Sequence, residues 1–199
     1  MSVPDFLARC PTLLRRPARR LAVLGLAAAL LAAACTPALD WRTLHSDAGY
    51  TIDLPAKPTL DAREIAIGGT PMTMRMQAAH VSGAVFAVGT VMLPDARPAT
   101  QQAALAVLRA ALSRNLHAAA TARDVMVPLA AGGTVPGIEL TVNGGAGAAA
   151  SGASGAAAGK TLVARLVARG AHVYQAVAIA DAPLPADALD QFFGSFRLD

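Results

Sequence analysis

Three methionines that alternate along one stretch of the chain are the residues whose chemistry is easiest to name. Met72, Met74 and Met76 are separated by polar residues, and His80 shares their parity. Thioether sulfur favours Cu(I), so a copper site is one interpretation. Methionine also fills irregular cores, and the intervening Thr, Arg and Gln side chains prefer water, which turns the methionines inward. We therefore expect core packing and no metal site, with copper binding by these four residues as the alternative.

Other patterns that resemble catalytic motifs lie in the wrong context. Residues 154–161, SGAAAGKT, differ at one position from a phosphate-binding loop, but a low-complexity tract precedes them where a buried strand is required. The four histidines are scattered, which leaves zinc unsupported. Ser195 lies in no G-x-S-x-G motif, and Asp187 and Asp190 fit the positive end of a helix dipole. We predict no catalytic residue, cofactor or nucleotide, and keep as an alternative a hydrolase whose triad forms only in space.

The elements that would position any site follow an N-terminal segment with the layout of an export signal. Five arginines precede an apolar run at 21–34, and Cys35 follows it directly. A helix of fourteen residues spans about 21 Å, which is short of the roughly 30 Å hydrocarbon core of a bilayer. We expect residues 1–34 to be a signal peptide that is removed.

The end of this run, LAAAC at 31–35, resembles the lipobox of bacterial lipoproteins. The resemblance implies that the Cys35 thiol receives a diacylglyceryl group, that the chain is cleaved before it, and that the new N-terminus carries three acyl chains, palmitate among them. Two or more chains make membrane attachment long-lived. Thr36 is typical of lipoproteins forwarded to the outer membrane. The alternatives are an ordinary secretory signal and an uncleaved anchor. Residues 35–39 are then a lipidated tether.

Composition limits what the exported part can be. Removal of 34 of the 199 residues leaves enough chain for one domain. Five of the 17 basic and one of the 13 acidic residues precede Cys35, so twelve of each remain and the mature chain is formally neutral. The sequence pI of about 9.7 therefore belongs largely to the signal and indicates no nucleic-acid partner. With Cys10 removed and Cys35 acylated, no disulfide is expected.

Hydrophobic periodicity predicts strands and two helices within a single domain at 40–199. Gly68-Gly69 and Gly170 suit hairpin turns, and Pro136-Gly137 is expected to separate two strands. Gly, Ala and Ser fill 144–159, which predicts a flexible loop. The expected strands cover residues 50–54, 62–67, 72–76, 84–93, 124–129, 138–142, 161–169 and 172–180. The expected amphipathic helices cover residues 100–117 and 186–198.

Four short motifs carry a further resemblance. They are GYTIDLP at 49–55, PGIEL at 136–140, HVYQAV at 172–177 and FFGSFRL at 192–198. Together they are similar to a diffuse group of exported bacterial proteins with a PsbP-like fold. The resemblance implies an α+β domain: a mainly antiparallel sheet of about six to eight strands, with one long central helix and a C-terminal helix packed on it.

Members of that fold tend to be accessory or assembly factors, and the resemblance implies no catalytic residues. We therefore expect a lipid-anchored lipoprotein of the cell envelope that faces the periplasm and binds an envelope protein without catalysing a reaction. The binding surface would be an exposed sheet face or the loop at 144–159. The alternatives are a periplasmic copper-binding protein that uses the methionine strand and a hydrolase.

Overall fold

The computed structural model describes residues 39–81, 83–116, 119–143 and 160–199, and most of these residues lie in two antiparallel sheets. The seven strands of the large sheet are, in spatial order, β3 (Thr59–Ile67), β4 (Thr70–Val81), β5 (Ala84–Met92), β9 (His172–Ala180), β8 (Thr161–Arg169), β7 (Thr134–Asn143) and β6 (Ala120–Pro128). The small sheet has the order β1 (Arg42–Ser46), β2 (Tyr50–Leu54) and β10 (Arg197–Leu198).

The large sheet consists of two meanders joined edge to edge. β3, β4 and β5 form the first and β6 to β9 the second, and β5 pairs with β9 along nine residues. Gly68 and Gly69 at the β3–β4 turn and Gly170 at the β8–β9 turn have positive φ angles, which glycine adopts without steric cost. The predicted hairpins at these glycines are confirmed.

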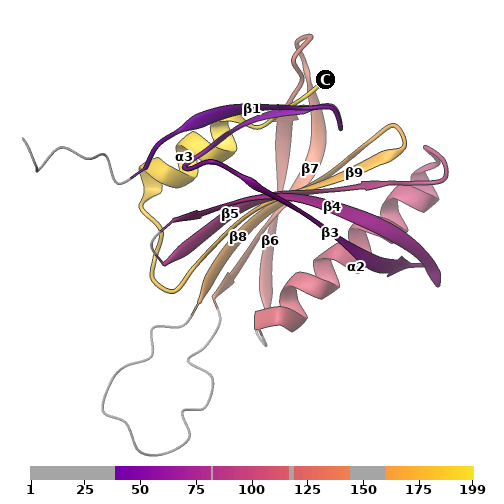
Figure 1. Ribbon diagram of the computed structural model, residues 1–199. Coiled ribbons are helices and arrows are strands. Elements are labelled where there is room, and N and C mark those ends of the chain that lie inside the picture. Colours follow the sequence, from indigo (N-terminus) through magenta and orange to yellow (C-terminus); the bar gives the residue numbers. More distant parts are fainter. Residues whose placement is uncertain (1–38, 82, 117–118, 144–159) are drawn as a thin grey trace, which may run out of the picture. The chain divides into compact units, whose positions relative to one another are not determined.

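The helix α2 (Pro98–Leu116) covers one face of the large sheet (Figure 1). It begins with a proline, whose fixed φ suits the first helical position. Ala104, Leu108 and Leu112 recur every four residues and are buried. They pack with Met74, Ile67 and aliphatic side chains of β5, β7, β8 and β9 in one of the two core clusters.

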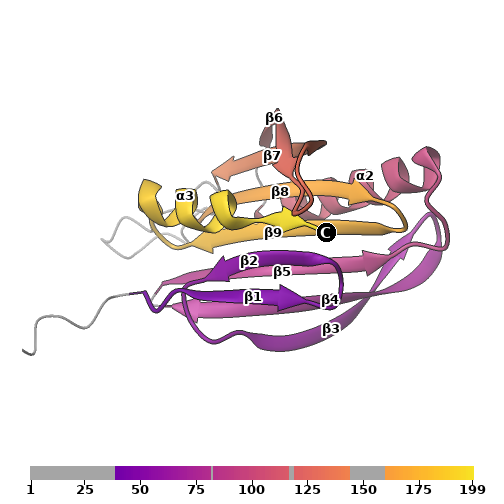
Figure 2. The same cartoon turned by 90° about the horizontal axis from the view of Figure 1, so that it is seen from above.

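The small sheet and the helix α3 (Ala186–Ser195) cover the opposite face, and α3 lies beside β2 (Figures 1 and 2). The core on this side is rich in aromatic rings. Phe192 and Phe196 are fully buried and pack with Tyr50, Phe86 and Tyr174. The large sheet is thus the middle layer of the described domain.

The α+β class with a mainly antiparallel large sheet agrees with the prediction, but the small sheet was not predicted. Nor is Pro136-Gly137 a turn: both residues lie inside β7, and the reversal occurs at residues 129–133. Pairing with β8 begins only at Gly137, so Pro136 has a partner strand on one side alone, where a missing N–H costs little. At Gly137 an added Cβ would lie 2.9 Å from the Leu166 carbonyl oxygen, so this approach of β7 to β8 requires glycine.

Several predictions fall outside the described residues. These are the signal peptide at 1–34, the lipidated Cys35, the tether up to residue 38 and the loop at 144–159. In the part of the chain that the structure describes, no helix combines the length and apolar character needed to cross a membrane.

Candidate functional site

The methionine strand is β4, and its methionines face the core as predicted, on the side covered by α2. Met74 is 1% exposed, whereas Met72 and Met76 are partly buried against the same core cluster. The side chains of Thr73 and Arg75 are exposed on the opposite face.

The structure does not bring His80 to these sulfur atoms. His80 is exposed, and it lies six residues along the strand from Met74, a separation of about 20 Å at the rise of a β-strand. Its surroundings include Lys160 and Asp181, which form an exposed ion pair at 3.3 Å. Among the residues that the structure describes, no three His, Cys, Asp or Glu side chains converge on a point that could hold a metal. A copper site would have to rest on neighbouring thioethers of β4 alone.

The sequence patterns that imitate catalytic motifs have structural roles. Thr161 is the first residue of β8, so the segment that resembles a phosphate-binding loop leads into a strand. Nucleotide binding would require a helix N-terminus at this point. Ser195 ends α3, and its hydroxyl donates to the Phe192 carbonyl at 2.9 Å and accepts from the Asp53 backbone N–H at 2.8 Å. Asp187 lies in the first turn of α3.

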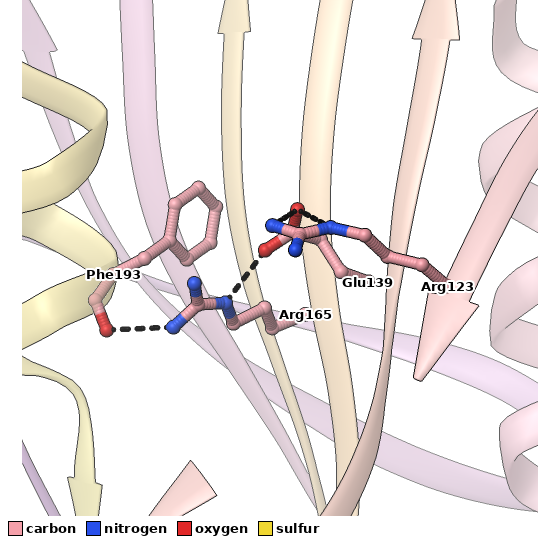
Figure 3. A network of polar contacts seen from close by, with 4 residues as sticks. All are labelled: Arg123, Glu139, Arg165 and Phe193. Carbon is pink, nitrogen blue, oxygen red and sulfur yellow. Dashed lines mark hydrogen bonds and ion pairs between the residues drawn. The ribbon is translucent and has the colours of Figure 1, made fainter. Parts of the chain in front are cut away.

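A buried carboxylate that sequence reasoning missed is bound by arginines of the two neighbouring strands (Figure 3). Glu139 of β7 is 6% exposed and accepts hydrogen bonds from Arg123 of β6 at 2.8 Å and from Arg165 of β8 at 2.8 Å. Arg165 also donates to the Phe193 carbonyl at 2.9 Å and lies 4.8 Å from the centre of the Phe193 ring. These four residues, the Glu139 network, attach α3 to the large sheet. Strand register brings Arg123, Glu139 and Arg165 together, and the one signal in the sequence was that they are charged residues inside strands.

A cavity of about 710 Å³ lies at one end of the large sheet, beside the β1–β2 turn. We call it the end pocket. Its polar lining comes from Asp47 of the turn, Thr70, Thr73 and Arg75 of β4, Thr90 of β5 and His172 of β9. Four separate segments thus contribute to one concave surface, and pockets of this size are typical of small-ligand sites.

The β1–β2 turn forms one wall of the end pocket, and the large sheet holds it in place. The Tyr174 hydroxyl donates to the Ala48 carbonyl at 2.8 Å. Gly49 has a φ of 83°, and a Cβ there would lie 3.3 Å from the same hydroxyl. Burial, followed by the charge of Asp199, raises the pKa of Tyr174 above the ordinary value of a phenol. This wall is therefore preorganised.

The end pocket combines a positive charge with hydroxyl groups. The Arg75 side chain is exposed, and His172 stacks on Tyr174 with ring centres 6.0 Å apart. Arg169 is the register partner of His172, and its Nη1 is buried with no hydrogen-bond partner among the described atoms. Thr90, 7% exposed, adds a hydroxyl, while Asp47 is the one described carboxylate in the lining. Guanidinium, imidazole and hydroxyl groups suit recognition of a carboxylate or phosphate.

An apolar rim completes the end pocket. Met92 is 72% exposed, an unusual position for a large apolar side chain, and it lies with Leu93 and Pro94 where the chain leaves β5. The backbone N–H of Leu93 donates to the Ala171 carbonyl at 2.7 Å, which fixes this exit against the β8–β9 turn. A ligand with both an anionic and an apolar part would contact both halves of the lining.

Comparison with known proteins adds no identification. No protein-family model matches the chain, and no curated protein matches it.

Proposed function

We propose that the chain is a bacterial lipoprotein whose acylated Cys35 holds a ligand-binding domain at the periplasmic face of the outer membrane. The support for the anchor is the apolar run at 21–34 that ends in LAAAC, together with Thr36. The compact unit begins at Leu39, only four residues after Cys35. Such a short tether would keep the domain close to the bilayer.

We further propose that the domain acts by binding and not by catalysis, as an accessory module for an envelope protein. The observation that carries this proposal is the end pocket, in which Arg75 and His172 face a preorganised turn beside an apolar rim. A PsbP-like architecture, with helices on both faces of an antiparallel sheet, is consistent with α2 and α3. The predicted ligand group is an anion carried by a partner, such as an acidic side chain or a chain terminus.

Site-specific photo-cross-linking in the native envelope tests this function. A benzoylphenylalanine in place of Met92 would lie in the end pocket, whereas one in place of Met126, which is 57% exposed on β6, would lie outside it. We expect one specific adduct from position 92, none from position 126, and loss of the adduct when Arg75→Gln is added. Equal capture from both positions, or capture unaffected by Arg75→Gln, would refute binding through this pocket.

The two alternatives have separate tests. Copper titration under reducing conditions, read by mass spectrometry, would reveal a one-to-one Cu(I) complex that Met74→Leu abolishes if β4 binds metal. Turnover in an ester and phosphoester screen would support a hydrolase. Either result would replace the binding-module proposal.

A further inference from the structure

A second cavity lies between α2 and the edge of the large sheet formed by β3 and β4, on the opposite face of the sheet from Thr73 and Arg75 of the end pocket. Its volume is about 400 Å³, within the roughly 300–1,000 Å³ range of small-ligand sites. Its walls and floor are mostly apolar. The apolar lining comes from Ile65, Met74, Val107, Leu108, Ala111 and Leu112. We call this cavity the helix pocket.

The helix pocket exists because α2 has a second apolar stripe beside the one that enters the core. Leu108 and Leu112 belong to the buried stripe and are each 4% exposed. Val107 and Ala111 lie one position earlier, remain partly exposed and line the pocket, and Arg114 continues their spacing of i, i+4 and i+7. The apolar surface formed by Val107 and Ala111 of α2 is therefore left open to a ligand above β3 and β4.

The floor of the helix pocket is adaptable. Gly89 of β5 has no side chain, and the Met74 methyl group fills the space, 2.1 Å from where a Cβ would be. Met74 has three rotatable bonds and can repack around a bound molecule. The Gln175 amide, 4% exposed, adds one polar group at the floor.

The lining of the helix pocket carries a net positive charge. Arg63 and Arg114 are both exposed and belong to the lining, and Arg63 Nη2 lies 3.8 Å from the Met74 sulfur. Glu64 is the third charged residue of the lining, so the pocket has a formal excess of one positive charge. Within the described part of the chain, neither guanidinium forms an ion pair. Two guanidinium groups at the end of an apolar slot match a carboxylate on a hydrocarbon chain.

We propose that the helix pocket binds a free fatty acid, with the alkyl chain between α2 and the sheet and the carboxylate between Arg63 and Arg114. The alkyl chain replaces water along Val107, Ala111 and Ile65, and each buried methylene tightens binding by about fourfold. Each arginine, being exposed, contributes about two- to fivefold. The site is independent of the end pocket and of acylation at Cys35.

A photoreactive fatty acid tests the site on the full chain in membranes of the producing cells. The probe is dodecanoate with a diazirine near its methyl end, and cross-linked positions are located by peptide mass spectrometry. We expect adducts in residues 63–66, at Met74 and in residues 107–114 that excess unlabelled dodecanoate removes, and none in residues 70–73, which line the end pocket. Dodecyltrimethylammonium, which has the same chain length and the opposite charge, should compete poorly. Adducts spread over the surface, or equal competition by the cation, would overturn the proposal.

Variants separate binding from general effects on the fold. Ala111→Trp fills the pocket and should abolish the adducts, and Arg63→Gln with Arg114→Gln should reduce them at least fourfold. Both arginines are exposed, so the double variant is expected to fold even if the tryptophan does not fit. Arg109→Gln, which removes an exposed arginine of α2 outside the pocket, should leave the adducts unchanged. Unchanged adducts in the double variant, or an equal loss in Arg109→Gln, would contradict the proposal.

Discussion

The two faces of the large sheet are packed with different kinds of side chains. Every aromatic residue in the described part of the chain belongs to the core on the side of the small sheet and α3, where five ring pairs have centre separations of 4.9–6.2 Å. The side covered by α2 is packed with aliphatic residues and methionine. We call these the aromatic face and the aliphatic face.

The aromatic face is packed rigidly, whereas the aliphatic face can adapt its packing. On the aromatic face, large rigid rings fill the layer, and the Glu139 network and the bond from Tyr174 to Ala48 attach the covering elements. On the aliphatic face, one helix crosses a wide sheet, a flexible methionine fills the gap above Gly89, and the helix pocket remains open. The end pocket lies at one end of the large sheet, beside the β1–β2 turn. We infer that the aromatic face stabilises the fold. The end pocket, beside the β1–β2 turn, and the helix pocket, on the aliphatic face, are the proposed ligand sites.

The largest expected effect is the loss of one ring from the aromatic face. Phe192→Ala should lower the free energy of unfolding by about 4 kcal/mol, since Phe192 is fully buried between rings that cannot close the cavity. Leu112→Ala on the aliphatic face should cost about 2–3 kcal/mol, because Met74 and α2 can relax. Urea unfolding measures both. A larger loss for Leu112→Ala would reverse the comparison.

The Glu139 network should give the next largest effect. Glu139→Gln removes the charge that two arginines share, and Arg165 is only 20% exposed, so we expect a loss of about 2 kcal/mol. The control is Asp181→Asn in the exposed pair with Lys160, which should cost less than about 0.5 kcal/mol. Equal losses in thermal unfolding would show that the network does not secure α3.

A pair of glycines compares the rigidity of the two faces directly. Gly137→Ala places a methyl group 2.9 Å from the Leu166 backbone and 3.2 Å from Val127, and should cost about 1–3 kcal/mol. Gly89→Ala meets only the flexible end of Met74, so its cost should stay below about 1 kcal/mol. Chemical denaturation of both variants provides the measurement. A greater loss for Gly89→Ala would contradict an adaptable aliphatic face.

The smallest expected effect is a pH dependence that comes from the aromatic face. Burial raises the pKa of Tyr50 from 10.0 to about 12, so the folded state holds the phenol proton more tightly than the unfolded state. The resulting stability is complete below pH 10 and is lost as the pH rises toward 12. Unfolding free energies measured from pH 8 to 11 should fall by about 1 kcal/mol. Tyr50→Phe should flatten part of this fall, and an identical fall in that variant would exclude Tyr50 as its source.

Local periodicity was sufficient for most of the fold. The segment at 161–169 fits both a helix and a strand, and the turn glycine Gly170 before another apolar run correctly favoured the strand β8. Pro136-Gly137 was wrongly placed between two strands and lies inside β7, because a proline is tolerated in a strand where one of its sides has no partner strand.

The candidate sites could not be predicted in the same way. The pairing of β5 with β9 joins residues that are 80 to 96 positions apart in the sequence, and it places Thr90 beside Tyr174. The end pocket follows from that pairing and from the β1–β2 turn lying against Tyr174, and neither is encoded in a local pattern. Glu139 and Arg165 likewise become neighbours only through the register of β7 and β8.

The most direct test of the proposed function is the intact mass of the protein extracted from membranes with detergent. The account predicts an N-terminus at Cys35 with the added mass of a diacylglyceryl group and one further acyl chain, and a Cys35→Ser variant that keeps its signal segment and lacks the lipid. A mature chain with an unmodified Cys35 thiol, or one released without detergent, would contradict it.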